Sequence, residues 1–175
     1  DAADYDIKER FSNKTVIVPT ASISIICGGT SPGVEPIAAN SYTHKTLSGS
    51  FNVRNKYLKK LLAKHNKDDD ETWSSITTNQ GSVSHLDFLT KDEKDVFKTA
   101  FELNQKWIVE LSADRTPHIS QAQSINIFLP ADVHKKELHQ IHFQAWKKGL
   151  KSLYYCRSKS IQRAENVNDA KSTDI

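Results

Sequence analysis

The sequence predicts an α/β fold, and three features lead to that prediction. Helical patterns alternate with short β-branched runs along the chain, an order of elements typical of α/β proteins. The final three predicted elements are strand, helix and strand, a unit that normally pairs its strands in parallel through a right-handed crossover. The chain has 175 residues, 37% of them hydrophobic, which is enough for one domain with a buried core.

The N-terminal third is predicted to hold one strand, a hairpin and the start of a helix. Residues 15–18 are a β-branched run that Pro19 stops, which indicates a buried strand. Residues 41–54 have the pattern of a hairpin, in which residues 42–47 and 50–54 flank a turn at residues 48–49. Asn55 can then cap a helix, because its side chain can accept the open N–H groups of a first turn.

Two further helices are predicted in the middle of the chain. A short one covers residues 72–79 and ends near Gly81. Thr90 and Glu93 have the spacing of a capping box. Behind this box, apolar residues recur at helical spacing as far as residue 111, so one long amphipathic helix is expected there.

The C-terminal part is predicted to be the strand–helix–strand unit. Residues 124–129 form a strand, Asp132 can cap the helix that follows, and Gly149 can close that helix. Residues 153–156 form the last strand. Apolar residues then become sparse, and residues 164–175 are expected to be a mobile tail.

The first candidate site is the turn that begins at Pro19. Thr20, Ser22 and Ser24 supply hydroxyl groups at alternate positions. If a helix starts here, its first N–H groups are unpaired, and the positive end of its dipole favours a phosphate. Alternatively, residues 23–27 form a second strand, because the run is β-branched. The residues alone leave both conformations open.

The second candidate site is the pair Tyr154 and Tyr155 on the last predicted strand. Neighbouring residues of a strand point to opposite faces of the sheet. Two such tyrosines most often pack in a core with their hydroxyl groups hydrogen-bonded. The functional alternative is a redox relay, since a phenol can lose a proton and an electron together.

The histidines and cysteines give no metal or disulfide signature. His134, His139 and His142 lie on one predicted helix, but a metal site needs three or four converging ligands, and no partner stands at a recognisable spacing. Cys27 and Cys156 are too few for a disulfide scaffold. Both are expected to be small buried residues.

Composition and charge exclude several classes of protein. The formal charge is +3, from 24 basic and 21 acidic residues, which predicts neither a nucleic-acid partner nor a membrane surface. No apolar run approaches the roughly 20 residues of a membrane span. The chain is therefore expected to be cytoplasmic. It contains no methionine, so we expect a fragment, a processed product or one part of a split subunit.

Four segments together carry a resemblance to a known family. They are PTASISIICGGTSPGVEP (residues 19–36), YTHKTLSGSF (42–51), QAQSINIFLP (121–130) and FQAWKKGLKSLYY (143–155). In this order and spacing they resemble the C-terminal part of the large subunit of class I, aerobic ribonucleotide reductase, especially the versions carried by large tailed bacteriophages. The resemblance covers residues 14–163.

The resemblance implies a fold and a role for each candidate site. The family's catalytic domain is a ten-stranded α/β barrel, and residues 1–163 would form its C-terminal portion. Tyr155 would receive an oxidising equivalent from the small subunit, and Tyr154 would pass it to the active-site cysteine. The matching loop binds the diphosphate of the substrate; its residues here are Pro19, Thr20, Ala21, Ser22, Ile23 and Ser24.

The activity implied by the resemblance is that of a ribonucleoside-diphosphate reductase, which replaces the ribose 2′-hydroxyl with hydrogen by radical chemistry. The implied reductant is thioredoxin or glutaredoxin. This chain would bind no cofactor itself. A diiron-tyrosyl radical would lie in the partner small subunit, and dNTP or ATP effectors would bind elsewhere in the large subunit.

The chain also departs from the family's pattern. The family's radical cysteine, its catalytic asparagine and glutamate, its reducing cysteine pair and its two tail cysteines have no match here. The chain is therefore expected to need the N-terminal remainder of the large subunit and to be inactive alone. Two alternatives stay open: part of a class II, cobalamin-dependent reductase, or a non-catalytic structural fragment that completes another subunit.

Overall fold

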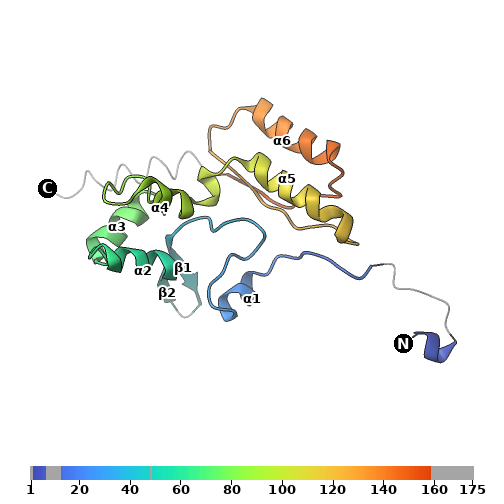
Figure 1. Cartoon of the computed structure of the whole chain (residues 1–175), viewed down its shortest axis with the longest axis horizontal. Helices are drawn as coiled ribbons and strands as arrows, with labels where there is room; N and C mark the ends of the chain where they lie inside the picture. Colours follow the sequence, from blue (N-terminus) through green and yellow to red (C-terminus); the bar gives the residue numbers. More distant parts are fainter. Residues whose placement is uncertain (1, 7–12, 48, 159–175) are drawn as a thin grey trace. The chain divides into compact units, whose positions relative to one another are not determined.

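The computed structural model describes residues 2–6, 13–47 and 49–158 (Figure 1). These residues belong to two compact units. One unit contains the described residues up to Glu35 together with residues 105–158, and the other contains residues 36–104. In the described ranges, every helix is too short or too polar to span a bilayer.

The unit of residues 36–104 begins with the predicted hairpin, which is confirmed. Its antiparallel strands are β1 (Ser41–Thr46) and β2 (Gly49–Arg54). Thr46 pairs with Gly49 at the closed end, so Gly49, which was predicted in the turn, begins the second strand. Ser48, the other residue of the predicted turn, falls outside the described residues.

Three α-helices follow the hairpin. They are α2 (Lys56–Lys64), α3 (Asp70–Thr78) and α4 (Lys91–Val96). Asn55 and Asp69 cap the first two with their side chains, and Thr90 and Glu93 form the predicted capping box of the third. The helices and the loops between them bury one core, formed by Leu58, Leu62, Trp73, Ile76, Val83, Leu86 and Leu89.

The single long helix predicted behind this capping box is wrong. α4 ends at Val96, a 3₁₀ turn (η2) covers Ala100–Glu102, and a separate helix, α5, covers Gln105–Arg115. A second capping box lies at the break, where the N–H and the hydroxyl of Thr99 donate to Glu102 Oε2 at 2.8 and 2.9 Å. Thr99 is extended, with φ −75° and ψ 162°. An extended residue ends a helix, so apolar spacing alone could not continue it.

The other unit contains β3 (Ile127–Leu129), α6 (Lys135–Lys147) and β4 (Cys156–Ser158) in sequence. β3 and β4 are parallel, so the predicted strand–helix–strand unit is confirmed, with strands shorter than expected. The remaining elements of this unit are η1 (Ala2–Tyr5), α1 (Ala21–Ile26), α5 and η3 (Thr116–His118). Its core consists of Ile108, Val109, Ile125, Ile127, Leu129, Ile141 and Ala145.

The two ends of α6 test the predicted caps. The N-cap is His134 and not Asp132, because His134 Nδ1 accepts the N–H of Lys136 at 3.1 Å. Gly149 follows the helix with a φ of 78° and donates its N–H to Trp146 O at 3.0 Å. The predicted closure at Gly149 is therefore confirmed.

Residues 121–129 are the middle of three parallel segments. On one edge, Ser124 N–H donates to Ile17 O at 2.9 Å, and Ile17 bridges Gln123. On the other edge, Tyr154 N–H donates to Ile125 O at 2.8 Å. Successive residues of an extended chain direct their polar backbone groups to opposite edges, so residues 15–18 and 154–158 flank this middle segment.

The segment 15–18 is not the buried strand that its sequence predicts. It forms one isolated bridge, at Ile17. Val16 and Val18 are each 47% exposed. A segment at the edge of a sheet is covered less than a central one, and Pro19 ends it after a few residues.

Candidate functional site

Of the two conformations that the sequence left open, residues 21–26 adopt the helix. α1 starts after Thr20 and ends before Cys27, whose N–H donates to Ile23 O at 2.8 Å. Gly29 N–H then donates to Ser24 O, also at 2.8 Å, and closes the helix. The alternative of a strand over residues 23–27 is therefore wrong.

Thr20 is the N-cap residue of α1, but its side chain makes no capping bond. Its N–H and its hydroxyl both donate to Pro32 O, each at 2.9 Å. The N–H groups of residues 21–23 consequently have no hydrogen-bond partner in the described ranges of the chain. An N-terminal turn left open in this way can receive an anion.

The three predicted hydroxyl donors of this turn differ in availability. Thr20 donates to Pro32 as described, and Ser24, which is buried, donates to Ala21 O at 2.7 Å. The hydroxyl of Ser22 is exposed and makes no bond to the described part of the chain. Ser22 is thus the hydroxyl best placed to donate to a ligand, together with the backbone N–H groups beside it.

The rings of Tyr154 and Tyr155 lie together, with their centroids 4.0 Å apart and their planes inclined at 51°. Tyr154 donates its hydroxyl to that of Tyr155 at 3.3 Å. Both residues precede β4, outside the regular strand, and this allows neighbouring side chains to lie on the same side. The opposite orientation that neighbours in a regular strand would have is therefore not adopted.

The phenol pair is half exposed and lies beside a cation. Tyr154 is 45% and Tyr155 is 53% exposed, so neither is packed in a core. The guanidinium of Arg157 lies 5.4 Å from the centre of the Tyr155 ring. The hydrogen bond to Tyr155, followed by partial desolvation, raises the pKa of Tyr154 above its usual value, and the charge of Arg157 opposes this rise.

The α1 turn and the phenol pair are connected to opposite edges of the middle segment. Ile17 bridges Gln123 on one edge, two residues before Pro19, after which the chain turns into α1. The N–H of Tyr154 is bonded to the carbonyl of Ile125 on the other edge. The two candidate sites therefore belong to the same set of parallel segments.

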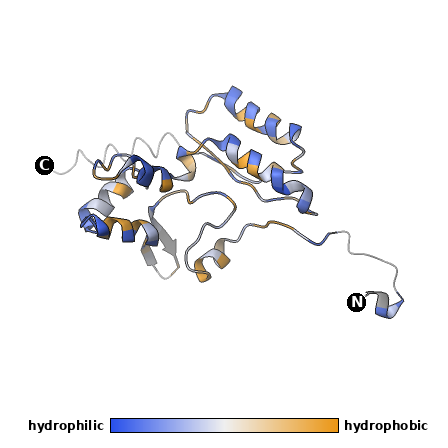
Figure 2. Cartoon of the chain, in the orientation of Figure 1, coloured by the Kyte–Doolittle hydropathy of each residue, from blue (hydrophilic) through white to orange (hydrophobic). Residues whose placement is uncertain are grey.

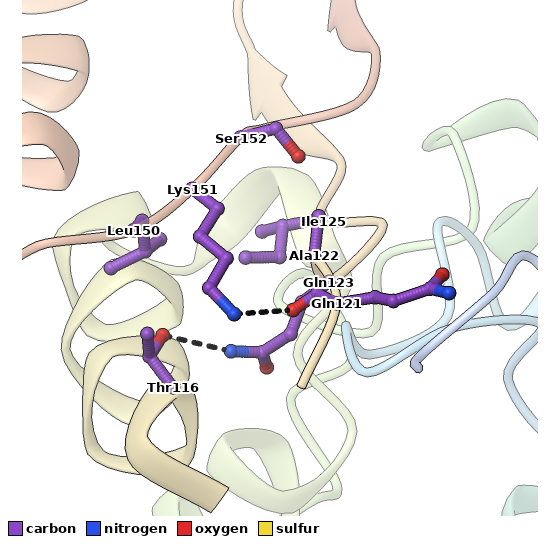
Figure 3. Close-up of a pocket in the computed structure, with 8 residues that line it drawn as sticks. All are labelled: Thr116, Gln121, Ala122, Gln123, Ile125, Leu150, Lys151 and Ser152. Carbon is purple, nitrogen blue, oxygen red and sulfur yellow. Dashed lines mark hydrogen bonds between the residues drawn. The ribbon is translucent and has the colours of Figure 1, made fainter. Parts of the chain in front are cut away.

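A small pocket in the same unit is lined by none of the residues of the two candidate sites (Figure 3). Lys151 Nζ donates there to the carbonyls of Ile119, Ser120 and Gln121 at 3.0, 2.5 and 3.2 Å. Gln123 Nε2 donates to Thr116 Oγ1 at 3.0 Å. The protein itself satisfies these polar groups. Lys151 and Gln123 are therefore better explained as residues that hold the loop 119–123 than as residues that bind a ligand.

The histidines and cysteines form no metal site within the described residues. His134 caps α6, His139 stacks on Phe143, and His142 bonds to Leu138 O. Cys27 and Cys156 are free thiols. Both are exposed, so the expectation of small buried residues is wrong.

Sequence reasoning missed Glu35, a carboxylate with 4% exposure in the loop after α1. Its Oε1 accepts the N–H of Asn126 in the middle segment. The one sequence signal nearby was the glycine- and proline-rich composition of residues 28–36, which indicates a turn but says nothing of a long-range bond.

Comparison with known proteins identifies a family over most of the chain. The family model of the ribonucleotide reductase barrel domain matches residues 3–156. A solved structure, the alpha subunit of the class Id ribonucleotide reductase of Actinobacillus ureae, matches with a TM-score of 0.74 at 42% sequence identity. That match covers 82% of this chain and 26% of the solved one.

Several curated relatives are named as large subunits of ribonucleoside-diphosphate reductase. The protein of Invertebrate iridescent virus 6 is 51% identical over 91% of this chain and 17% of its own length. The protein of Invertebrate iridescent virus 3 is 47% identical over 94% of this chain and 26% of its own length. The Caenorhabditis elegans protein is 37% identical over 84% of this chain and 18% of its own length. The chain thus spans between 17% and 26% of the length of these relatives.

Proposed function

The chain belongs to the ribonucleotide reductase barrel-domain family, and on this premise we propose that it supplies two parts of a ribonucleoside-diphosphate reductase large subunit. The turn at residues 19–24 binds the diphosphate of the substrate. Tyr154 and Tyr155 relay the radical. The α/β arrangement of the described residues and the class I alpha subunit it resembles support this assignment. The predicted likeness to bacteriophage versions stays a prediction.

One observation carries the proposal: an open helix turn and a hydrogen-bonded phenol pair are connected to opposite edges of the same parallel middle segment. The open N–H groups of residues 21–23 and the Ser22 hydroxyl suit the oxygens of a diphosphate. The phenol pair suits stepwise transfer, because its hydroxyl groups are 3.3 Å apart and can exchange a proton as an electron moves.

The direction of transfer in this proposal runs from Tyr155 to Tyr154. Tyr155 accepts the oxidising equivalent from a small subunit, in which a diiron-tyrosyl radical generates it. Tyr154 passes it to an active-site cysteine on the N-terminal remainder of the large subunit. Thioredoxin or glutaredoxin supplies reducing equivalents, and dNTP or ATP effectors bind outside this chain. The predicted barrel portion, residues 1–163, and a cytoplasmic location belong to the same proposal.

The first test concerns diphosphate binding. Inorganic pyrophosphate titrated into the 175-residue chain should bind at residues 20–24, as seen by shifts of the amide signals of those residues in NMR spectra. Ser22→Ala should weaken this binding several-fold, because one donor to the anion is lost. Shifts spread evenly over the lysine-rich surface would contradict a site at this turn.

The second test concerns the relay. The chain alone should reduce no nucleotide, and activity should require the remainder of the large subunit and a small subunit. In that assembly Tyr155→Phe should abolish turnover, because phenylalanine has no hydroxyl to oxidise. Tyr57→Phe is the matched control, since Tyr57 is an exposed tyrosine in the other unit, and it should leave turnover unchanged.

The outcomes separate the rival assignments. Full activity of Tyr155→Phe would favour a cobalamin-dependent class II reductase, which needs no small subunit. Pyrophosphate binding with no activity in any assembly would favour a structural fragment. Turnover by the isolated chain would overturn the proposal.

A further inference from the structure

At the sheet edge beside the diphosphate turn, the N–H of Asn126 lacks the backbone carbonyl that a continued parallel ladder would supply. Ser124 N–H donates to Ile17 O at 2.9 Å. A parallel ladder repeats every two residues, so the next bond on this edge would join Asn126 N–H to Pro19 O. The chain instead turns away at Pro19 into α1.

Glu35 takes the place of the missing carbonyl. Its side-chain Oε1 accepts the N–H of Asn126. The residue is 4% exposed, and a buried carboxylate is costly unless it is hydrogen-bonded. A side chain at position 33 would require the Glu35 carboxylate to shift, because its Cβ would lie too close to Glu35 Oε2. The glycine is therefore compatible with the observed position of the carboxylate.

The same loop holds the start of α1. Residues 31–35, which we call the strap, begin with Ser31, whose hydroxyl donates to Glu35 O. The second residue of the strap, Pro32, accepts both the N–H and the hydroxyl of Thr20. A continuous path of hydrogen bonds thus links the middle segment, through Glu35 and the strap, to the N-cap of α1.

In the described part of the chain, the isoleucines of α1 are largely exposed. The helix is one of the more apolar helices in the chain (Figure 2). Yet Ile23, Ile25 and Ile26 are 57%, 61% and 83% exposed. Its short length of six residues is well below that of a stable isolated helix. Its β-branched sequence would also fit a strand, so an anchor outside the helix must decide the conformation.

We propose that Glu35 is a positioning residue that ends the ladder of residues 15–18 and thereby holds residues 19–26 in the helical turn. The inference rests on the function proposed above, in which this turn receives the diphosphate. Glu35 itself does not touch the substrate. Its carboxylate satisfies the donor that would otherwise draw Pro19 and the residues after it into the sheet.

Two substitutions that remove the same charge test the proposal in the 175-residue chain. Glu35→Gln keeps an acceptor oxygen for Asn126 N–H, whereas Glu35→Ala removes it. We expect Glu35→Ala to weaken pyrophosphate binding about tenfold or more and Glu35→Gln to change it less than about threefold. If Glu35 acted through its charge alone, both would strengthen binding of the anion equally. Equal affinities for the two variants would overturn the proposal.

A second measurement tests the hydrogen bond between Glu35 and Asn126 directly. Hydrogen exchange of the Asn126 amide should be faster by about tenfold in Glu35→Ala and nearly unchanged in Glu35→Gln. Glu137→Ala, which removes a carboxylate from an exposed position on α6, is the charge control and should alter neither readout. If Glu35→Ala does not fold, Glu35→Asp replaces it, since it keeps the charge but shortens the reach. A wild-type response from Glu35→Asp would then refute the anchor.

The two proposals can fail separately. If the unmodified chain binds no pyrophosphate while exchange at Asn126 follows the expected order, the diphosphate site is wrong and the anchor stands. If pyrophosphate binds normally but exchange at Asn126 is unaffected by Glu35→Ala, the positioning role is wrong and the site stands.

Discussion

The first turn of α1 differs from the first turns of the helices in residues 36–104. In residues 36–104, Asn55, Asp69 and Thr90 each accept first-turn N–H groups with their own side chains. In the other unit, Thr20 occupies the same position before α1 but donates to Pro32 O. A cap stabilises a helix by about 1 kcal/mol. α1 lacks that contribution while its amides remain open to a ligand.

The side-chain hydrogen bonds of Asn40 and of the phenol pair show a similar contrast. Asn40, with 1% exposure, donates to Gly81 O and Phe97 O at 3.0 and 2.7 Å, and its Oδ1 accepts from Asn55 Nδ2 at 2.9 Å. The amide of Asn40 is thus used entirely inside its unit. Tyr154 and Tyr155 bond to each other while remaining half exposed. The amide of Asn40 is thus closed off, whereas the two phenols proposed for radical transfer are left accessible.

The largest effect should come from breaking the closed network. Asn40→Ala removes three side-chain hydrogen bonds, and Gly81 O keeps a second donor, the N–H of residue 40. The free energy of unfolding should therefore fall by about 3 kcal/mol. Urea denaturation followed by circular dichroism measures it. The exposed Asn52, which accepts from Thr43 Oγ1 at 3.2 Å in the hairpin, is the control. Asn52→Ala should lower the free energy of unfolding by less than about 0.5 kcal/mol. An equal loss in the two variants would show that the buried hydrogen bonds of Asn40 stabilise the fold no more than the exposed one of Asn52.

A smaller effect should separate the capped helices from α1. Thr90→Ala should lower the free energy of unfolding by about 1 kcal/mol, because the capping box with Glu93 is lost. Ser22→Ala in the first turn of α1 should change it by less than about 0.5 kcal/mol, while still weakening pyrophosphate binding. The same urea titrations compare the two. A Ser22→Ala chain as destabilised as Thr90→Ala would show that the α1 turn is structural.

The capping box should also respond to acid. The hydrogen bond from His65, followed by those from Thr90, lowers the pKa of Glu93 from 4.5 to about 2. Because the folded chain has the lower pKa, this stabilisation is complete above pH 4.5 and is lost as the pH falls from 4.5 towards about 2. The urea midpoint of the native chain should therefore fall across this window more steeply than that of Glu93→Gln. Urea midpoints that fall equally in the native chain and in Glu93→Gln would argue against a lowered pKa of Glu93.

The smallest effect concerns the open phenol pair. The hydrogen bond that Tyr154 donates to Tyr155 raises the pKa of Tyr154 above its usual 10. Tyr155→Phe should therefore lower that pKa, and Arg157→Ala should raise it further, because a nearby positive charge favours the phenolate. The Cζ signal of Tyr154 in ¹³C spectra, followed from pH 9 upward, reports it. An unchanged value in Tyr155→Phe would mean that the two hydroxyl groups are not bonded in solution.

Much of the fold could be predicted from short stretches of sequence. The hairpin, the caps at Asn55 and Thr90, the closure at Gly149 and the parallel strand–helix–strand unit are confirmed. Each depends on residues close in the chain. The long helix failed at Thr99, where a second local cap interrupted the apolar period.

The candidate sites were located from the sequence, but their geometry was not. The hydroxyls of Thr20, Ser22 and Ser24 looked equivalent, and the structure leaves that of Ser22 unbonded to the described residues. The tyrosines lie with their rings together, which neighbouring residues of a regular strand would not do. Their roles in substrate binding and radical transfer stay predictions until the variants above are measured.

The sequence by itself determined which segments form helices and strands wherever capping and turn residues act over three or four positions, since those bonds form within one turn. It also determined the family, through four segments in a set order. The tertiary structure alone decided whether residues 21–26 become helix or strand. That choice depends on Pro32 and on a bond between Glu35 and Asn126, 91 residues apart. A bond at that separation exists only once the sheet has formed, because loop closure must come first.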